Sequence, residues 1–196
     1  MANSKVKNKA KENKKKVEKC TSATMTVKVN GRKIEHSGRK FLKAVGIILL
    51  PLAVGIIASV CTISAQESFN AFAQPPLAPP AWLFPVVWTI LYLMMGVASY
   101  LIYRVKVNNW RERRLKVAEL AIFYVQLIFN IAWTLIFFNS DMKYFAFGWL
   151  IAMWLMILAF ILMAFRNRKA AAWLMVPYIL WCTFAAYLNI AIAILN

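Results

Sequence analysis

The sequence PPLAPPAWLFPVVWTILYLMMGVASYLIY, residues 75–103, decides the fold of this chain. Two Pro-Pro pairs lead into 23 uncharged residues, 81–103. At about 1.5 Å per residue these make a helix of roughly 34 Å, long enough to cross a hydrocarbon core of about 30 Å. Prolines keep the preceding chain extended and are tolerated in a first helical turn. The stretch therefore predicts a transmembrane helix that begins just after residue 80.

The rest of the chain repeats this pattern. The protein has 196 residues, is 62% hydrophobic and has a mean hydropathy of +0.59, which is too apolar for an ordinary soluble domain. Four further apolar runs are long enough to span, at residues 44–64, 120–140, 144–165 and 170–194. We therefore expect an all-α polytopic membrane protein, a five-transmembrane-helix bundle over residues 41–196 with a basic N-terminal tail.

The first predicted span has two features that bear on its role. Its apolar run is too long, and follows too many residues, for a secretory signal peptide. Pro51 is expected to bend the helix, and Gly46 and Gly55 are expected to allow another helix to approach closely.

The charge of the chain is unevenly distributed. Of its 24 Lys and Arg residues, 14 lie within residues 1–43. They are not interleaved with base-stacking aromatic residues, so we expect no nucleic-acid binding. Residues 1–40 are expected to be a disordered cytosolic tail, either simply solvated or docked on anionic lipid headgroups.

The same distribution predicts the orientation in the membrane. With the N-terminus in the cytosol, 23 of the 24 basic residues lie on the cytosolic side and only Lys143 lies outside. Because basic residues are enriched in cytosolic segments, we expect a cytosolic N-terminus and an external C-terminus.

Residues typical of catalytic and metal sites are scarce. The one histidine, His36, lies in the tail, and Cys20, Cys61 and Cys182 have no paired spacing. The sequence contains no Ser-His-Asp set, no cluster of metal ligands and no glycine-rich phosphate loop. We therefore expect no metal and no obligatory cofactor, and a binding protein is favoured over an enzyme.

Polar and aromatic side chains recur at helical spacing within three of the spans. Trp88 and Tyr92 share a face with Met95 and Ser99. Two further faces carry Gln126, Asn130, Trp133 and Phe137, and Pro177, Trp181, Ala185 and Leu188, with Tyr178 and Asn189 beside the latter. Together these residues predict an aromatic cavity for a flat, weakly polar ligand. The alternative is that the aromatic residues form interfacial belts and the amides bridge helices, and spacing alone leaves both open.

The motifs resemble those of one family, the translocator proteins, also called tryptophan-rich sensory proteins or peripheral-type benzodiazepine receptors. Its second helix is similar to Pro79-Pro80, Phe84, Val87-Trp88, Leu91-Tyr92, Met95-Gly96 and Ala98-Ser99-Tyr100. Its third is similar to Gln126-Leu127, Asn130, Trp133 and Phe137-Phe138, and its fifth to Leu174, Pro177-Tyr178, Trp181, Phe184-Ala185 and Leu188-Asn189. The resemblance covers residues 41–196.

The resemblance implies five tilted helices, a homodimer, and a cavity capped by the loop after the first helix. It implies binding of porphyrins such as protoporphyrin IX, and of isoquinoline carboxamide or benzodiazepine-type ligands, for sensing, sequestration or transport. By motif position the cavity would be lined by Trp88, Tyr92, Asn130, Trp181 and Ala185. In some bacterial members the tryptophans that match Trp88 and Trp181 are tied to light-dependent porphyrin breakdown. A photo-oxidative enzyme and a small-molecule transporter are therefore the alternative functions.

Two departures from the family pattern affect these expectations. Gln74 and Leu77 replace the Lys and Trp of the family's loop motif Lys-Pro-x-Trp-x-Pro-Pro, which weakens the case for tight loop closure. No basic residue follows Tyr187, so the sterol motif of animal members lacks its charge. We therefore expect no sterol transport and place the protein in a bacterial cytoplasmic membrane.

Overall fold

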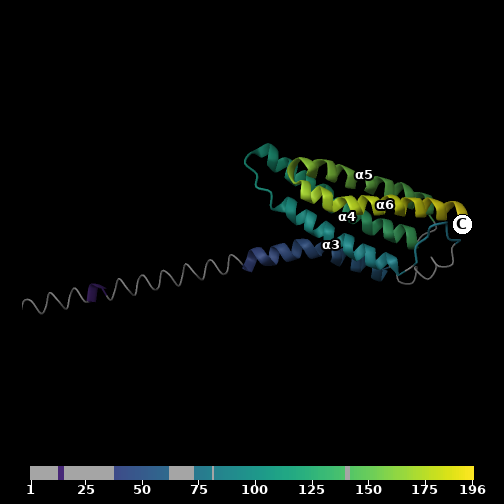
Figure 1. Ribbon diagram of the computed structural model, residues 1–196, viewed down its shortest axis with the longest axis horizontal. Helices are drawn as coiled ribbons and strands as arrows, with labels where there is room; N and C mark the ends of the chain where they lie inside the picture. Colours follow the sequence, from purple (N-terminus) through teal and green to yellow (C-terminus); the bar gives the residue numbers. More distant parts are fainter. Residues whose placement is uncertain (1–12, 16–37, 62–72, 81, 140–141) are drawn as a thin grey trace, which may run out of the picture. The chain divides into compact units, whose positions relative to one another are not determined.

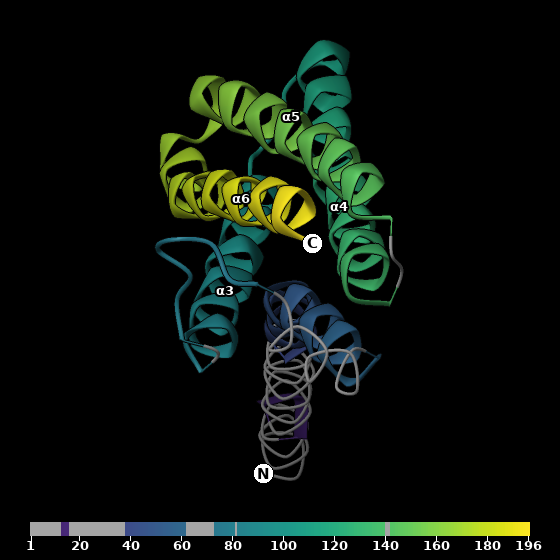
Figure 2. The ribbon, with the colours of Figure 1, turned by 90° about the vertical axis from the view of Figure 1, so that its right-hand side faces the viewer.

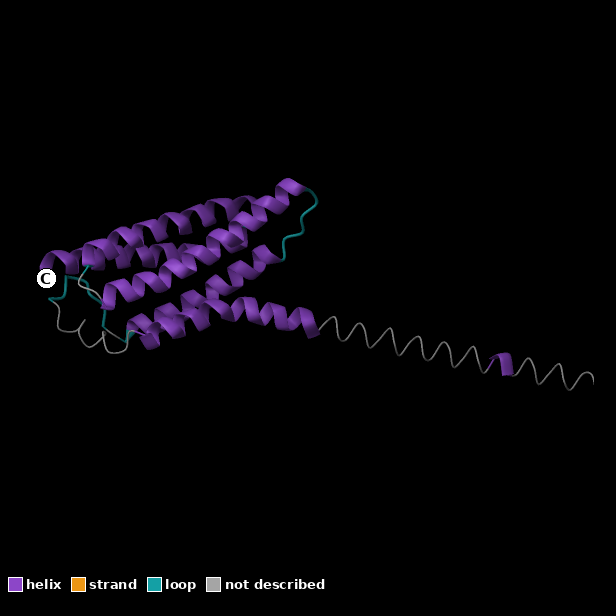
Figure 3. Ribbon diagram, turned by 180° about the vertical axis from the view of Figure 1, so that it is seen from behind, coloured by secondary structure: helices purple, strands orange, loops and turns teal. Residues whose placement is uncertain are grey.

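The computed structural model describes residues 13–15, 38–61, 73–80, 82–139 and 142–196. They form two units, residues 1–44 and residues 45–196. The first unit contributes an exposed helical turn at residues 13–15 and the beginning of the first long helix. The rest of the predicted tail, including His36, lies outside the described residues. Those that are described form helices and loops and no strand (Figure 3).

Five of the described helices are long and apolar enough to cross a membrane. The first is Gly38–Cys61, and the others are α3 (Leu83–Tyr103), α4 (Trp110–Asn139), α5 (Lys143–Asn167) and α6 (Lys169–Leu195). This confirms the all-α fold with five membrane-spanning helices. The first helix continues through Pro51 without interruption.

The last four helices pack as a ring in which α3 contacts α4, α4 contacts α5, α5 contacts α6 and α6 contacts α3 (Figures 1 and 2). The α3–α4 loop and the α5–α6 turn lie at one end of this ring, and the C-terminus lies at the other (Figure 1). The core between the helices is built from aliphatic and aromatic side chains, with Met95, Phe123, Met153 and Tyr178 fully buried. Such packing holds membrane helices together, since lipid supplies little hydrophobic force between them.

The beginning of α4 corrects the sequence prediction. The predicted span began at residue 120, after a basic loop, whereas the helix begins at Trp110. The cause is a capping arrangement: Asn109 Oδ1 accepts from the backbone N–H of Glu112 at 2.9 Å, and the Glu112 carboxylate accepts from the backbone N–H of Asn108 at 2.8 Å. These bonds satisfy donors that a helix start leaves free, so Arg111 and the residues after it are helical.

Glycine contacts fix the first helix on α3. A Cβ atom at Gly55 would lie 2.9 Å from Cζ of the Tyr92 ring, and one at Gly96 would overlap the backbone oxygen of Ile48. The close approach predicted at Gly55 is therefore confirmed. The one predicted at Gly46 is wrong, because no described atom comes within 4 Å of a Cβ there. The second point of contact is provided by α3, through Gly96.

Candidate functional site

A chain of buried hydrogen bonds crosses the bundle from α3 to α4 and α6. Tyr92 on α3 donates its hydroxyl to Asn130 Oδ1 on α4 at 2.6 Å. The Asn130 amide donates to the Tyr178 hydroxyl on α6 at 3.2 Å, and that hydroxyl donates to Gln126 Oε1 at 3.1 Å. Asn130, Tyr178 and Gln126 are fully buried. Polar groups away from water need such partners, so this chain joins three helices in a specific rotation.

One donor of this chain is left over. Within the described structure Gln126 Nε2 is buried and has no hydrogen-bond partner. Leaving a buried donor unsatisfied costs about 1–3 kcal/mol. The amide is therefore a place where an acceptor atom of a bound molecule would be stabilised.

Aromatic rings cover the polar chain. The half-buried ring of Trp88 stacks on Tyr92 with centroids 5.4 Å apart and an interplanar angle of 29°. It also meets Tyr178 edge-on at 6.2 Å. Gly55 of the first helix also lies against the Tyr92 ring. The cluster of Trp88, Tyr92, Gln126, Asn130 and Tyr178, called here the central cluster, thus combines flat apolar faces with a few polar atoms.

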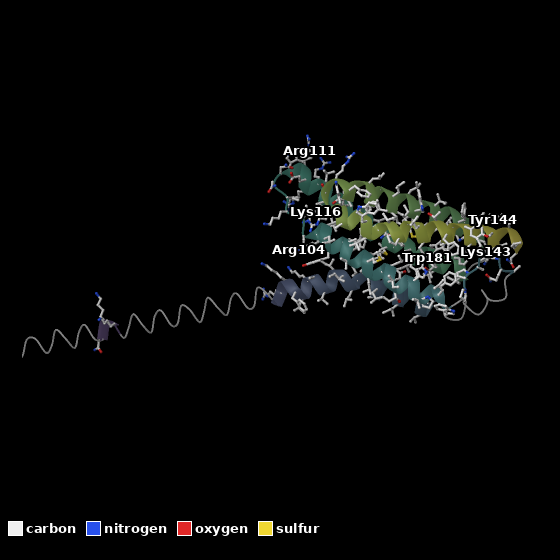
Figure 4. The ribbon with its side chains drawn as sticks, viewed as in Figure 1. Arg104, Arg111, Lys116, Lys143, Tyr144 and Trp181 are labelled. Carbon is white, nitrogen blue, oxygen red and sulfur yellow. The ribbon has the colours of Figure 1, made fainter. Side chains whose placement is uncertain are left out.

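The second tryptophan of the predicted cavity lies elsewhere. Trp181 meets Phe84 edge-on at 6.0 Å and packs on Phe184 at 5.5 Å. It borders an open apolar groove of about 440 Å³ between α3 and α6, and Figure 4 shows it on α6 where that helix faces α3. The groove is lined by Val87, Ile90, Leu91, Met94, Pro177, Leu180, Trp181 and Phe184. The structure therefore divides the predicted aromatic cavity into a closed polar cluster and an open apolar groove.

Trp133 belongs to a third group of contacts, toward the start of α5. Its ring stacks on Phe137 at 5.4 Å, and its side chain is 7% exposed. With the Asn189 amide oriented to satisfy both of its ends, Trp133 Nε1 donates to it at 3.2 Å and the amide donates to the backbone oxygen of Lys143 at 2.9 Å. Trp133 and Asn189 therefore tie α4, α5 and α6 together.

The interior face of α6 is rotated from the one predicted. The prediction placed Pro177, Trp181, Ala185 and Leu188 on one face, but Pro177 is exposed and Trp181 half-buried. The buried face instead carries Tyr178, Cys182, Ala185 and Asn189. Tyr178 was thus missed as the centre of the cluster. Its spacing of eleven residues from Asn189, which places both side chains on one face of this apolar helix, was the signal that could have identified it.

The loop that follows the first helix is tied to the end of α6. Tyr187 donates its hydroxyl to the Pro76 carbonyl at 2.7 Å. The Asn196 amide accepts from the backbone N–H of Ala73 at 2.9 Å and donates to the Ala73 carbonyl at 3.3 Å. Leu77 has a φ of 69° and is exposed. The described part of this loop therefore lies against the end of α6.

Known proteins match this chain over its membrane domain. The model of the TspO/MBR family matches residues 47–195. The tryptophan-rich protein TspO of Chlorobaculum tepidum is 36% identical over 148 residues, 75% of this chain and 91% of the relative. The protein of the same name from Archaeoglobus fulgidus is 33% identical, covering 79% of this chain and 97% of the relative. The translocator protein of Ovis aries is 34% identical, with 76% and 87% covered. The chain therefore belongs to the TspO/MBR family of membrane proteins.

Proposed function

We propose that this membrane protein binds a tetrapyrrole such as protoporphyrin IX, or another flat apolar molecule, in the central cluster. The observation that carries the proposal is the buried hydrogen-bond chain that ends at Gln126, whose Nε2 has no partner in the described structure, together with the stacked rings of Trp88 and Tyr92. Membership of the TspO/MBR family supports it. Such binding serves sensing, sequestration or transport of the ligand.

The residues of the central cluster have distinct roles in this proposal. Trp88 is half-buried, so a change of its rotamer exposes the face of Tyr92 on which it now stacks. A conjugated macrocycle takes the place of the indole and stacks on that face. Gln126 Nε2 then donates to a ligand oxygen or nitrogen, which satisfies the amide and orients the ligand. Trp181 lies in the open groove and contacts the ligand's edge at most.

The exposed surface of the helices bears on the setting of the protein in the membrane. We propose that the protein forms a homodimer in a bacterial cytoplasmic membrane, with a cytosolic N-terminus. Large apolar side chains such as Ile90, Ile128 and Leu162 are exposed on three different helices, which is the composition that a surface in contact with lipid or with another apolar helix requires. Crosslinking of the protein in native membranes tests the dimer.

Quenching of tryptophan fluorescence by protoporphyrin IX, in the dark and in detergent, tests the binding site. Tyr92→Phe removes only the hydroxyl at the start of the chain, and Gln126→Leu removes the unpartnered Nε2 together with the Oε1 that accepts from Tyr178. We expect each to weaken saturable binding about tenfold, which corresponds to about 1.4 kcal/mol. Tyr92→Phe leaves Asn130 Oδ1 without the donor that orients the chain, and Gln126→Leu removes the donor to the ligand. Tyr144→Phe is the matched control, because Tyr144 is 64% exposed at the end of the bundle.

Two outcomes would count against the proposal. Quenching that never saturates means that the porphyrin only partitions into the micelle. Saturable quenching that is unchanged in Tyr92→Phe and Gln126→Leu but lost in Phe184→Ala moves the ligand from the central cluster to the apolar groove.

A further inference from the structure

A partly buried hydrogen bond brings two basic segments of the chain to the same end of the bundle. Glu119 on α4 is 1% exposed, and its Oε1 accepts from the side-chain amide of Asn167, the last residue of α5, at 2.6 Å. The α5–α6 turn, with Arg166, Arg168 and Lys169, is therefore held beside α4. Residues 111–114 lie five to eight positions before Glu119, which is about 8–12 Å along the helix. Figure 4 shows Arg104, Arg111 and Lys116 at this end and Lys143 at the opposite one.

The first turns of α4 stand clear of the helix packing. None of the residues 110–118, all of which the structure describes, is buried. Trp110 is 66% exposed, and the guanidinium carbon of Arg114 lies 5.4 Å from the centre of its indole ring. Leu115 and Val117 are also exposed, so cations and apolar side chains share this segment. Mixed segments of this kind lie at the boundary between headgroups and acyl chains.

The acidic residues of these segments are already engaged. The Glu112 carboxylate accepts from Asn108 and Asn109 in the helix cap. Glu119 is buried; its Oε1 accepts from Asn167, and its Oε2 has no partner in the described structure. Lys116 donates to the carbonyl oxygens of Tyr103 and Val105 and so closes the α3–α4 loop. The charged side chains left exposed in residues 110–118 and 166–169 are all cationic: Arg111, Arg113, Arg114, Arg166, Arg168 and Lys169. We call these six residues, with Trp110, the basic end.

We propose that the basic end is a docking surface for the headgroups of acidic phospholipids. The charges are complementary, and a bundle that spans a bilayer holds its helix ends at headgroup level. Exposed apolar side chains favour a lipid over a soluble polyanion as the partner: Trp110, Leu115 and Val117. Their transfer into the boundary of the acyl chains lowers the free energy, whereas a soluble acidic partner offers them no apolar surface. This inference is independent of the proposed tetrapyrrole site.

The test compares acidic and zwitterionic lipid around the full-length protein. The protein is reconstituted in phosphatidylcholine bilayers with a trace of spin-labelled phosphatidylglycerol or spin-labelled phosphatidylcholine. The fraction of motionally restricted label gives the preference for the acidic lipid. We expect the variant Arg111→Gln/Arg113→Gln/Arg114→Gln to lower this preference at least twofold. High salt should lower the preference of the wild type and have less effect on the variant.

Three further variants make the result specific. The same three positions changed to Lys keep the charge and should keep the preference. Lys5→Gln/Lys7→Gln/Lys9→Gln makes the same change of charge in the tail and should have the smaller effect. Should the triple Gln variant of α4 lose its helicity or melt early, Arg166→Gln/Arg168→Gln/Lys169→Gln tests the other half of the basic end.

Two results would overturn the proposal. If the tail variant and both variants of the basic end lose the lipid preference equally, the preference comes from the net positive charge of the protein and not from the basic end. An unchanged lipid preference, together with poly-glutamate binding that is lost in the α4 variant, assigns the basic end to a soluble acidic partner.

Discussion

Replacement of Gly96 by alanine should separate the first helix from α3. A Cβ at this position would overlap the Ile48 carbonyl oxygen and lie 2.7 Å from its carbonyl carbon and 2.9 Å from its Cα. Non-bonded carbon atoms normally stay about 3.5–4.0 Å apart, so the first helix must move by about 1 Å. The obstacle is backbone, which cannot rotate away as a side chain can. Forced overpacking of this kind costs about 1–3 kcal/mol.

A second glycine supplies the matched control. Alanine is favoured over glycine in a helix by about 1 kcal/mol, and this gain applies equally to Gly96→Ala and Gly148→Ala. At Gly148, an exposed position of α5, no described atom lies within 4 Å of a Cβ. The difference in unfolding free energy between the two variants therefore isolates the steric cost, and we expect Gly96→Ala to be less stable by about 1–3 kcal/mol.

Unfolding of both variants in mixed micelles by increasing fractions of dodecyl sulfate, followed by circular dichroism, measures this difference. The two free energies are compared at the same detergent fraction, so that long extrapolation is avoided. Equal stability of Gly96→Ala and Gly148→Ala would refute the close packing of the first helix on α3. It would also count against the contact of Gly55 with the Tyr92 ring.

Three other changes test separate contacts. Asn167→Ala should destabilise the protein by about 1–3 kcal/mol in the same unfolding assay, because it leaves the buried carboxylate of Glu119 without its donor, whereas Glu119→Gln, which keeps an oxygen acceptor, should cost less. Tyr187→Phe removes the hydroxyl that holds the Pro76 carbonyl, so hydrogen exchange in this loop should accelerate while exchange in α5 stays unchanged. Asn109→Ala removes the cap of α4 and should increase exchange in its first turn, at a cost of about 1 kcal/mol; no change there would show that the turn is held by other contacts.

Much of the fold could be predicted because membrane helices are recognised by length and composition. The stretch at residues 81–103 predicted α3 within two residues of its observed bounds, Leu83–Tyr103. The beginning of α4 was missed, because hydropathy does not detect a helix that leaves the apolar layer. The capping pair Asn109 and Glu112 was visible in the sequence and would have predicted it.

The sequence predicted which residue types lie between the helices at the candidate site, but only partly which of these side chains contact one another. Gln126, Asn130 and Tyr92 are buried as their spacing indicated. The partner that joins them, Tyr178, was assigned to the edge of its helix face, and Trp181 was assigned to the interior although it borders the open groove. Tyr178 and Trp181 are three positions apart in the chain and therefore only about 60° apart around the helix, so a modest error in the rotation of α6 is enough to misplace both.

The sequence by itself determined that the chain crosses a membrane as five helices and which few polar side chains those helices carry. Long uncharged runs leave the backbone no other way to satisfy its hydrogen bonds in lipid. Only the tertiary structure decided which side chains meet. The rotation of each helix is set by packing, such as Gly55 against Tyr92 and Tyr178 between Gln126 and Asn130, and these contacts join residues far apart in the chain. The spacing of residues within one helix cannot predict its rotation, because that rotation depends on contacts with the neighbouring helices.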